Sequence, residues 1–204
     1  MIRPTLAVTR TAFADQPLKP ITPVSCIYPE ASEFLSYPSP CLIVLAGASG
    51  IGKSTWGLRL FPEKSILSSD KMRLLLSGDE SNMEISAQAF YLLHLMARQK
   101  LSQGQSVVVD STALDPRARN DLVALAQHHK TSVHLILLEG SPELCFEGQT
   151  TRERKVPENV ILDQLAASQE LHRLIEARTM GQEGFSSALS LTREQAQAVK
   201  EARI

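Results

Sequence analysis

Residues 41 to 55 read Cys-Leu-Ile-Val-Leu-Ala-Gly-Ala-Ser-Gly-Ile-Gly-Lys-Ser-Thr, an apolar run that breaks into a glycine-rich turn. The turn fits the pattern G-x-x-x-x-G-K-[ST], the phosphate-binding P-loop. Its glycines leave the backbone free to curl, so that successive N–H groups can point inward around a phosphate. A buried-strand pattern precedes the loop, and a helix is expected from Lys53 to Leu60, with its positive dipole end at the same spot. This order of strand, loop and helix predicts a P-loop protein that binds a nucleoside triphosphate.

The loop supplies the expected nucleotide-binding residues. ATP is the expected nucleotide, and the pattern leaves other nucleoside triphosphates open. We expect Lys53 to reach the β- and γ-phosphates and the Ser54 hydroxyl to ligate Mg²⁺. The full set of expected cofactor-binding residues is Gly47, Ala48, Ser49, Gly50, Ile51, Gly52, Lys53, Ser54 and Thr55.

Downstream of the loop, strand and helix patterns alternate. Apolar runs predict strands at 65–68, 107–110, 133–138 and 185–191. Helical periodicity and capping signals predict helices at 86–103, from Asp115 towards 129, from Ser141, at 157–180 and after Thr192. Buried strands that alternate with helices indicate an α/β fold, a P-loop NTPase or kinase with a mainly parallel sheet flanked by helices. Ligands in such folds bind beyond the carboxyl ends of the strands.

Residues 1–40 have a composition of their own. Seven of the 11 prolines lie there, which predicts extended chain with interspersed apolar residues packed in part on the domain. We therefore expect a proline-rich arm at 1–40, with an unknown partner if it has one, and a P-loop kinase domain at 41–204.

The rest of the composition is that of a soluble globular protein. The formal net charge of −1 argues against extensive binding of duplex nucleic acid, although a strand's end could still be gripped by a few arginines. The three cysteines are odd in number and widely spaced, which predicts neither a disulfide framework nor a zinc site and favours the cytoplasm. No apolar run approaches 18 residues, so no membrane span is expected.

Asp70 and Arg73 are the first catalytic candidates. Asp70 follows the 65–68 strand, where a carboxylate can accept the proton of an attacking hydroxyl. Arg73 lies one helical turn further on, on the same side, and can bind an anionic group of the acceptor. The alternative is that Asp70 only caps the next helix and that Arg73 is solvated.

Further candidates are Asp110, Arg152 and Arg154. Asp110 closes a Val-rich strand and is expected to hold Mg²⁺, because Asp115 already serves as the next helix cap. Arg152 and Arg154 stand between two helices, where a lid could close over the triphosphate and stabilise charge on the transferred group. A solvated charge run is the alternative reading of that segment. Two further arginines, Arg117 and Arg119, could belong either to the active site or to the solvent-exposed surface of a helix.

Taken in order, these segments resemble the kinase domain of bacterial polynucleotide kinase-phosphatases, within the polynucleotide-kinase-like P-loop kinases. The matching stretches are 42–55, 68–73, 108–112, 118–119 and 152–161. The resemblance implies transfer of the γ-phosphate of ATP to the 5′-hydroxyl end of DNA or RNA. It gives Asp70 the role of general base, Arg73 a contact with the acceptor's phosphate, and Arg152 or Arg154 the role of lid arginine.

Two positions depart from the family. Ala113 stands where an asparagine is typical, and Gly148 stands where an arginine is common. Both departures bear on the acceptor more than on the ATP chemistry. Two alternatives therefore stay open: a P-loop kinase of a sugar, nucleoside or antibiotic hydroxyl, and a non-catalytic nucleotide-binding interaction module.

Overall fold

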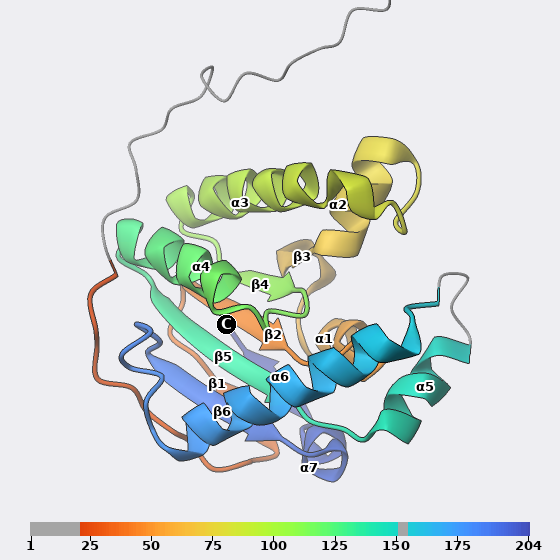
Figure 1. Ribbon diagram of the computed structural model, residues 1–204. Coiled ribbons are helices and arrows are strands. Elements are labelled where there is room, and N and C mark those ends of the chain that lie inside the picture. Colours follow the sequence, from red (N-terminus) through yellow and green to blue (C-terminus); the bar gives the residue numbers. More distant parts are fainter. Residues whose placement is uncertain (1–20, 151–154) are drawn as a thin grey trace, which may run out of the picture.

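The computed structural model describes residues 21–150 and 155–204. Its centre is a five-stranded, wholly parallel sheet with the strand order β3-β4-β2-β5-β6 (Figure 1). The strands in chain order are β2 (Cys41–Ala46), β3 (Ile66–Ser68), β4 (Val107–Asp110), β5 (Ser132–Leu138) and β6 (Ser187–Leu191). The predicted α/β fold with a mainly parallel sheet is therefore confirmed.

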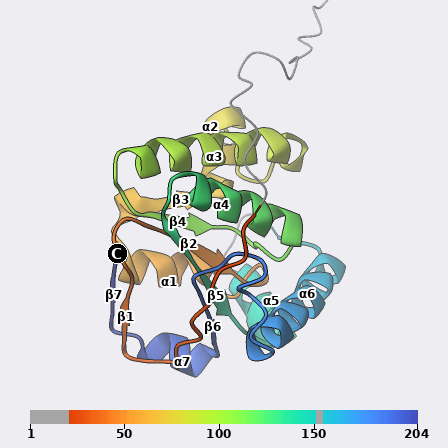
Figure 2. The ribbon, with the colours of Figure 1, turned by 90° about the vertical axis from the view of Figure 1, so that its left-hand side faces the viewer.

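Helices cover both faces of this sheet. On one side lie α1 (Lys53–Leu60) and α7 (Arg193–Ala198), and on the other side lie α3 (Ser86–Ser102) and α4 (Pro116–His128) (Figure 2). The second side also receives α2 (Ser69–Ser77) through Met72 and α6 (Glu158–Glu176) through Leu171. The remaining helical segments are α5 (Pro142–Thr150) and the short 3₁₀ turns η1 (Glu63–Ser65) and η2 (Met83–Ile85).

The sequence of β2 explains why two helical layers form. Every residue of this central strand is buried, because side chains that alternate along a strand enter different cores. Leu42, Val44 and Ala46 pack among α3, α4 and α6. On the other face, Cys41, Ile43 and Leu45 pack with Trp56 of α1 and Ala196 of α7. The strand that leads into the P-loop is thus fixed from both sides.

Most predicted element boundaries agree with the structure to within two residues, and one does not. Helix α1 has the predicted bounds, and the Asp115 carboxylate caps α4 by accepting from Arg117 N at 2.9 Å. The predicted helix at 157–180 is too long, because α6 ends at Glu176. The backbone then turns at Arg178, which has a left-handed φ of 56°, and carries Met180 into the core.

The residues before β2 pair with two different strands of the domain. Strand β1 (Phe34–Ser36) pairs in parallel with β7 (Glu201–Arg203) to form a separate two-stranded sheet. Ile27 bridges Ser187, so the chain also runs beside the edge strand β6. The sequence patterns predicted neither β1 nor β7.

Candidate active site

The P-loop connects β2 to α1 at the carboxyl end of the sheet. Its first glycine, Gly47, donates a backbone hydrogen bond to Thr112 O at 3.0 Å, which joins the loop to the segment after β4. Lys53 is buried and bends back over the loop, where its Nζ donates to the carbonyls of Gly47 and Ala48 at 2.8 Å each. This lysine therefore lies at the centre of the loop, at the N-terminal end of α1, as an anion site requires.

Helix α5 packs directly on the backbone of the P-loop. Gly50 has a left-handed φ of 89°, and a Cβ built there would lie 2.2 Å from Cys145 O. A Cβ on Gly148 would lie 2.0 Å from Gly50 O. The glycine at position 148 is therefore dictated by this contact, since any side chain there would push α5 off the loop. Burial raises the pKa of the Cys145 thiol, opposed by the nearby charge of Lys53.

A second helix also reaches the loop. Ser49 N donates to Oε1 of Gln164, a residue of α6, at 2.8 Å. Sequence reasoning missed Gln164, and no motif marks it, because its role depends on how α6 crosses the loop.

On one side of the P-loop, most of the predicted catalytic and metal residues line a single cavity of ≈ 190 Å³. Lys53 and Ser54 come from the loop and α1, Asp110 from the end of β4, and Asp70 and Arg73 from α2. Strand register explains this convergence, since Ser68 at the end of β3 lies opposite Asp110. The structure thus brings together five of the predicted catalytic and metal residues, and the predicted phosphate-loop residue Ser49 lines the same cavity.

Asp70 and Arg73 form an ion pair across one turn of α2. The guanidinium is buried, and its Nε also donates to Glu80 O at 2.7 Å. The Asp70 carboxylate keeps 41% of its side chain exposed. Asp70 is not the cap of α2, because Ser68 holds that position and Asp70 is within the first turn. The predicted placement of both groups on one side of the helix is therefore confirmed.

Asp110 and Ser54 have the chemistry for a magnesium ion. A buried carboxylate and a hydroxyl face the same cavity, and hard oxygen ligands of this kind suit Mg²⁺ when phosphate oxygens complete its shell. The described residues contain no group of three or more His, Cys, Asp or Glu side chains that could hold a metal by themselves. The residues present therefore fit a metal held jointly with a phosphate.

The loop that follows Asp110 is held by a buried arginine. Arg119 is 1% exposed and binds both carboxylate oxygens of Glu183 at 2.8 Å. Its Nη1 donates to Ala113 O at 3.2 Å and to Leu114 O at 3.0 Å. Ala113 has a left-handed φ of 47°, a conformation that asparagine adopts more readily than alanine. Arg119 is thus a structural support and not a helix-surface residue.

On the other side of the P-loop lies a larger cavity of ≈ 640 Å³. Thr55 and Trp56 of α1, Thr150 of α5 and Gln197 of α7 are among its lining residues. Arg59 lines it as well, with its guanidinium held by the carbonyls of the α7 segment at 2.7 and 2.8 Å. The cavity borders Gly50, Ile51 and Gly52 and is large enough for a nucleoside.

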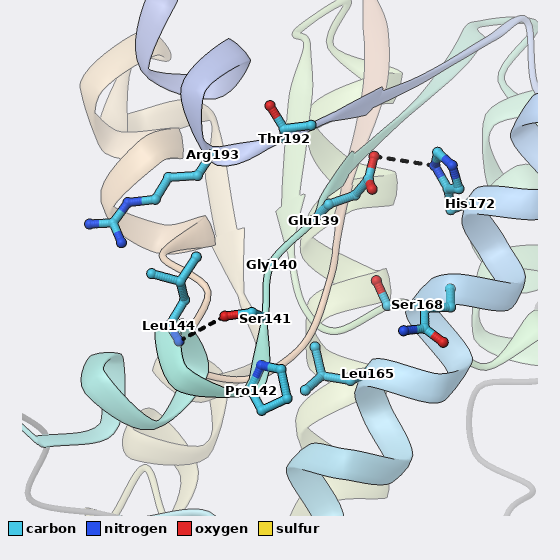
Figure 3. A pocket seen from close by; sticks show the side chains of 11 residues that line it. Glu139, Gly140, Ser141, Pro142, Leu144, Leu165, Ser168, His172, Thr192 and Arg193 are labelled. Carbon is cyan, nitrogen blue, oxygen red and sulfur yellow. Dashed lines mark hydrogen bonds and ion pairs between the residues drawn. The ribbon is translucent and has the colours of Figure 1, made fainter.

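A third cavity, of ≈ 430 Å³, adjoins the second and shares Glu139, Leu144 and Arg193 with it. Figure 3 shows Glu139 and His172 pointing toward one another at its edge, with Glu139 Oε1 3.2 Å from His172 Nδ1. Ser190 donates to the same carboxylate oxygen. None of the predicted site residues that the structure describes lines this cavity.

The predicted lid residues Arg152 and Arg154 lie outside the described residues. Within the parts that are described, no helix is both long enough and apolar enough to cross a membrane. Cys26, Cys41 and Cys145 are all free thiols.

The sequence profile of a family described as an AAA domain matches residues 42–173. The chain belongs to this AAA domain family. The matched range of the AAA domain begins in β2 and ends within α6, so it contains the P-loop, Asp70, Arg73 and Asp110. No curated protein matches the sequence.

Solved structures share the fold of this AAA domain at low identity. A chain of the Pnkp1/Rnl/Hen1 RNA repair complex has a TM-score of 0.56 at 19% identity, over 67% of this chain and 46% of that one. A gluconokinase from Sinorhizobium meliloti 1021 has a TM-score of 0.52 at 19% identity, and the match covers 80% of this chain and 90% of that one. A chain of the AvrRxo1-ORF1:-ORF2 complex with ATP has a TM-score of 0.54 at 19% identity, and the match covers 70% of this chain and 51% of that one. The chain thus spans only about half the length of the first and third of these proteins.

Proposed function

We propose that this AAA domain is an ATP-dependent phosphotransferase that moves the γ-phosphate to a hydroxyl, and that the acceptor is the 5′-hydroxyl end of DNA or RNA. One observation carries the proposal: Lys53 and Ser54 of the P-loop line the same cavity as Asp70, Arg73 and Asp110. A protein that only bound or sensed a nucleotide would need no carboxylate and arginine facing the γ-phosphate end of its P-loop.

The chemistry follows from these positions. Asp70 takes the proton of the acceptor hydroxyl while that oxygen attacks the γ-phosphorus. The bond between the γ-phosphorus and its bridging oxygen breaks, and ADP leaves with the electron pair. Arg73 orients the Asp70 carboxylate through their ion pair, and Arg73 itself lines the cavity where an acceptor phosphate can bind.

Lys53 neutralises charge on the transferred phosphoryl group once it exchanges its two loop carbonyls for phosphate oxygens. A magnesium ion bound by Ser54 and Asp110 would supply further charge neutralisation at the phosphates. The nucleoside of ATP fits the ≈ 640 Å³ cavity on the far side of the loop, next to Thr55 and Trp56.

The lining of the acceptor cavity favours a nucleotide end over a sugar acid. Met83, Phe90 and Val160 face it, and Met83 and Val160 are solvent-exposed. Such apolar and aromatic surface suits the face of a base. The solved structures sharing this fold include both a chain of an RNA repair complex and a gluconokinase, so the fold is compatible with either acceptor.

A small-molecule acceptor remains the second candidate, because the cavity is only ≈ 190 Å³. Lys53 and Arg73 are the cations among its described lining residues, which gives a long phosphate backbone few partners. A free nucleoside would use the same apolar surface without needing further arginines.

The test is phosphoryl transfer from γ-labelled ATP with Mg²⁺ to 5′-hydroxyl DNA, 5′-hydroxyl RNA, free nucleosides and gluconate. We expect label on the oligonucleotides, and a rate about 10² to 10⁴ times lower for Asp70→Asn. Asp121→Asn, an exposed residue of α4, is the matched control and should keep the wild-type rate. Label on nucleosides alone would replace the polynucleotide acceptor by a small one, and unchanged transfer by Asp70→Asn would remove Asp70 as the base.

A further inference from the structure

Gln149 carries a buried amide with one end unused. This residue of α5 is 5% exposed, and its Oε1 accepts a hydrogen bond from Val156 N at 3.1 Å. Because only the oxygen of an amide can accept, this bond fixes the other end as the NH₂ donor. That nitrogen, Nε2, has no hydrogen-bond acceptor among the described residues. A buried donor left in this way costs folding free energy, so its retention calls for an explanation.

The unused donor lies at the P-loop. A Cβ built on Gly50 would be 2.9 Å from Gln149 Nε2. The close contact between Gly148 and Gly50 O holds this part of α5 against the loop, and the Val156 bond holds the side chain in place. Gln149 therefore presents a fixed N–H donor to the turn that the sequence pattern assigns to phosphate.

The neighbouring glutamine provides a contrast. Gln164 Oε1 already accepts from Ser49 N, so its oxygen is directed at the loop. An amide oxygen satisfies a loop N–H group but repels a phosphate oxygen. Gln149 has the opposite orientation, with its donor toward the loop, which is the polarity that an anion needs.

We propose that Gln149 Nε2 donates a hydrogen bond to a phosphate oxygen of the bound nucleoside triphosphate. The inference rests on the proposed function, because it requires that the P-loop holds the donor nucleotide. It adds a phosphate contact from α5 that depends on neither Lys53 nor the metal. The contact recognises the phosphate chain and not the nucleoside.

Two substitutions separate this role from a purely structural one. Gln149→Glu keeps an acceptor for Val156 N and nearly the same shape, but it replaces the donor by a negative charge. Gln149→Met removes both donor and acceptor. If Gln149 only tied α5 to the start of α6, the methionine variant would lose stability, but in its folded form it would bind triphosphate like wild type. If it binds phosphate, glutamate is the more damaging change for binding.

The experiment is isothermal titration of the full chain at pH 8 with Mg²⁺, using a non-hydrolysable ATP analogue, inorganic triphosphate and adenosine. Gln149→Glu should raise the dissociation constants of the analogue and of inorganic triphosphate at least about tenfold, and the increase for Gln149→Met should be several-fold smaller. Adenosine binding should stay unchanged. The matched control is Gln105→Glu, the same charge change at an exposed residue before β4, which should bind all three probes like wild type.

Thermal melting of each variant shows whether it is folded, and Gln149→Met serves as the test if Gln149→Glu is not. Triphosphate binding within twofold of wild type by the folded variants would overturn the role of Gln149 and leave the proposed function intact. A wild-type chain that binds neither the analogue nor inorganic triphosphate would instead overturn the proposed function, and this inference with it.

Discussion

Replacing Gly148 by alanine is expected to loosen the contact between α5 and the P-loop. The added Cβ would lie 2.0 Å from Gly50 O and 2.9 Å from Gly50 C. Both atoms belong to the backbone, so no side chain can rotate out of the way. Since real Cβ atoms stay 3.0 Å or more from their neighbours, α5 must move by about 1 Å relative to the loop.

Two opposing effects set the size of the change. Alanine is favoured over glycine within a helix by about 1 kcal/mol. Overpacking costs about 1 to 3 kcal/mol, and an overlap between backbone atoms belongs at the upper end of that range. The net loss of folding free energy is then about 1 to 2 kcal/mol, which lowers the melting temperature by roughly 2 to 8 °C for a chain of this size.

Gly57→Ala is the matched control, because Gly57 is also within a helix. Its added Cβ would meet Leu45 Cδ1 at 3.0 Å, the movable end of a side chain, so we expect a melting temperature at or above that of wild type. Calorimetry gives the melting temperatures, and titration with the ATP analogue gives the affinity. If Gly148→Ala melts at or above wild type and binds the analogue equally well, the contact does not constrain the loop.

Three further changes test other parts of the structure. Burial lowers the pKa of His134 from 6.5 to about 4, so the folded chain resists its protonation. The free energy of unfolding is therefore highest above pH 6.5 and falls toward pH 4, by about 2 kcal/mol between pH 7.5 and pH 5. Urea unfolding should show that the His134→Asn variant lacks this part of the pH dependence. Arg119→Met should cost about 3 kcal/mol in the same assay, because it leaves the Glu183 carboxylate and two loop carbonyls without their donor; a cost below 1 kcal/mol would show that the pair is dispensable. Thr192→Ala removes the side-chain half of the α7 capping box and should cost about 1 kcal/mol, whereas an unchanged midpoint would mean that packing alone fixes α7.

The parts of the fold that sequence predicts well are those set by local chemistry. The P-loop, the Asp115 cap and the apolar strands each depend on neighbouring residues, and each is found at or close to its predicted position. Asp70 and Asp110 were placed correctly because parallel strands end at one edge of the sheet, which brings residues far apart in sequence into one cavity.

The missed features depend on contacts between distant segments. Nothing near Gly148 in the sequence indicates that a side chain at this position would collide with Gly50 O. The structural role of Arg119 is equally hidden from local sequence, since its carboxylate partner Glu183 lies 64 residues away. Strands β1 and β7 were missed because each has only three residues, too few for a periodic pattern.

The pairing of β1 with β7 also sets an order of events during synthesis. Phe34–Ser36 leaves the ribosome before the P-loop does, yet its partner Glu201–Arg203 is made after every strand of the central sheet. Strand β1 can therefore pair only once residues 201–203 have been made, and this contact spans nearly the whole described chain. A chain truncated before residue 201 would keep β1 but lack the strand with which it pairs.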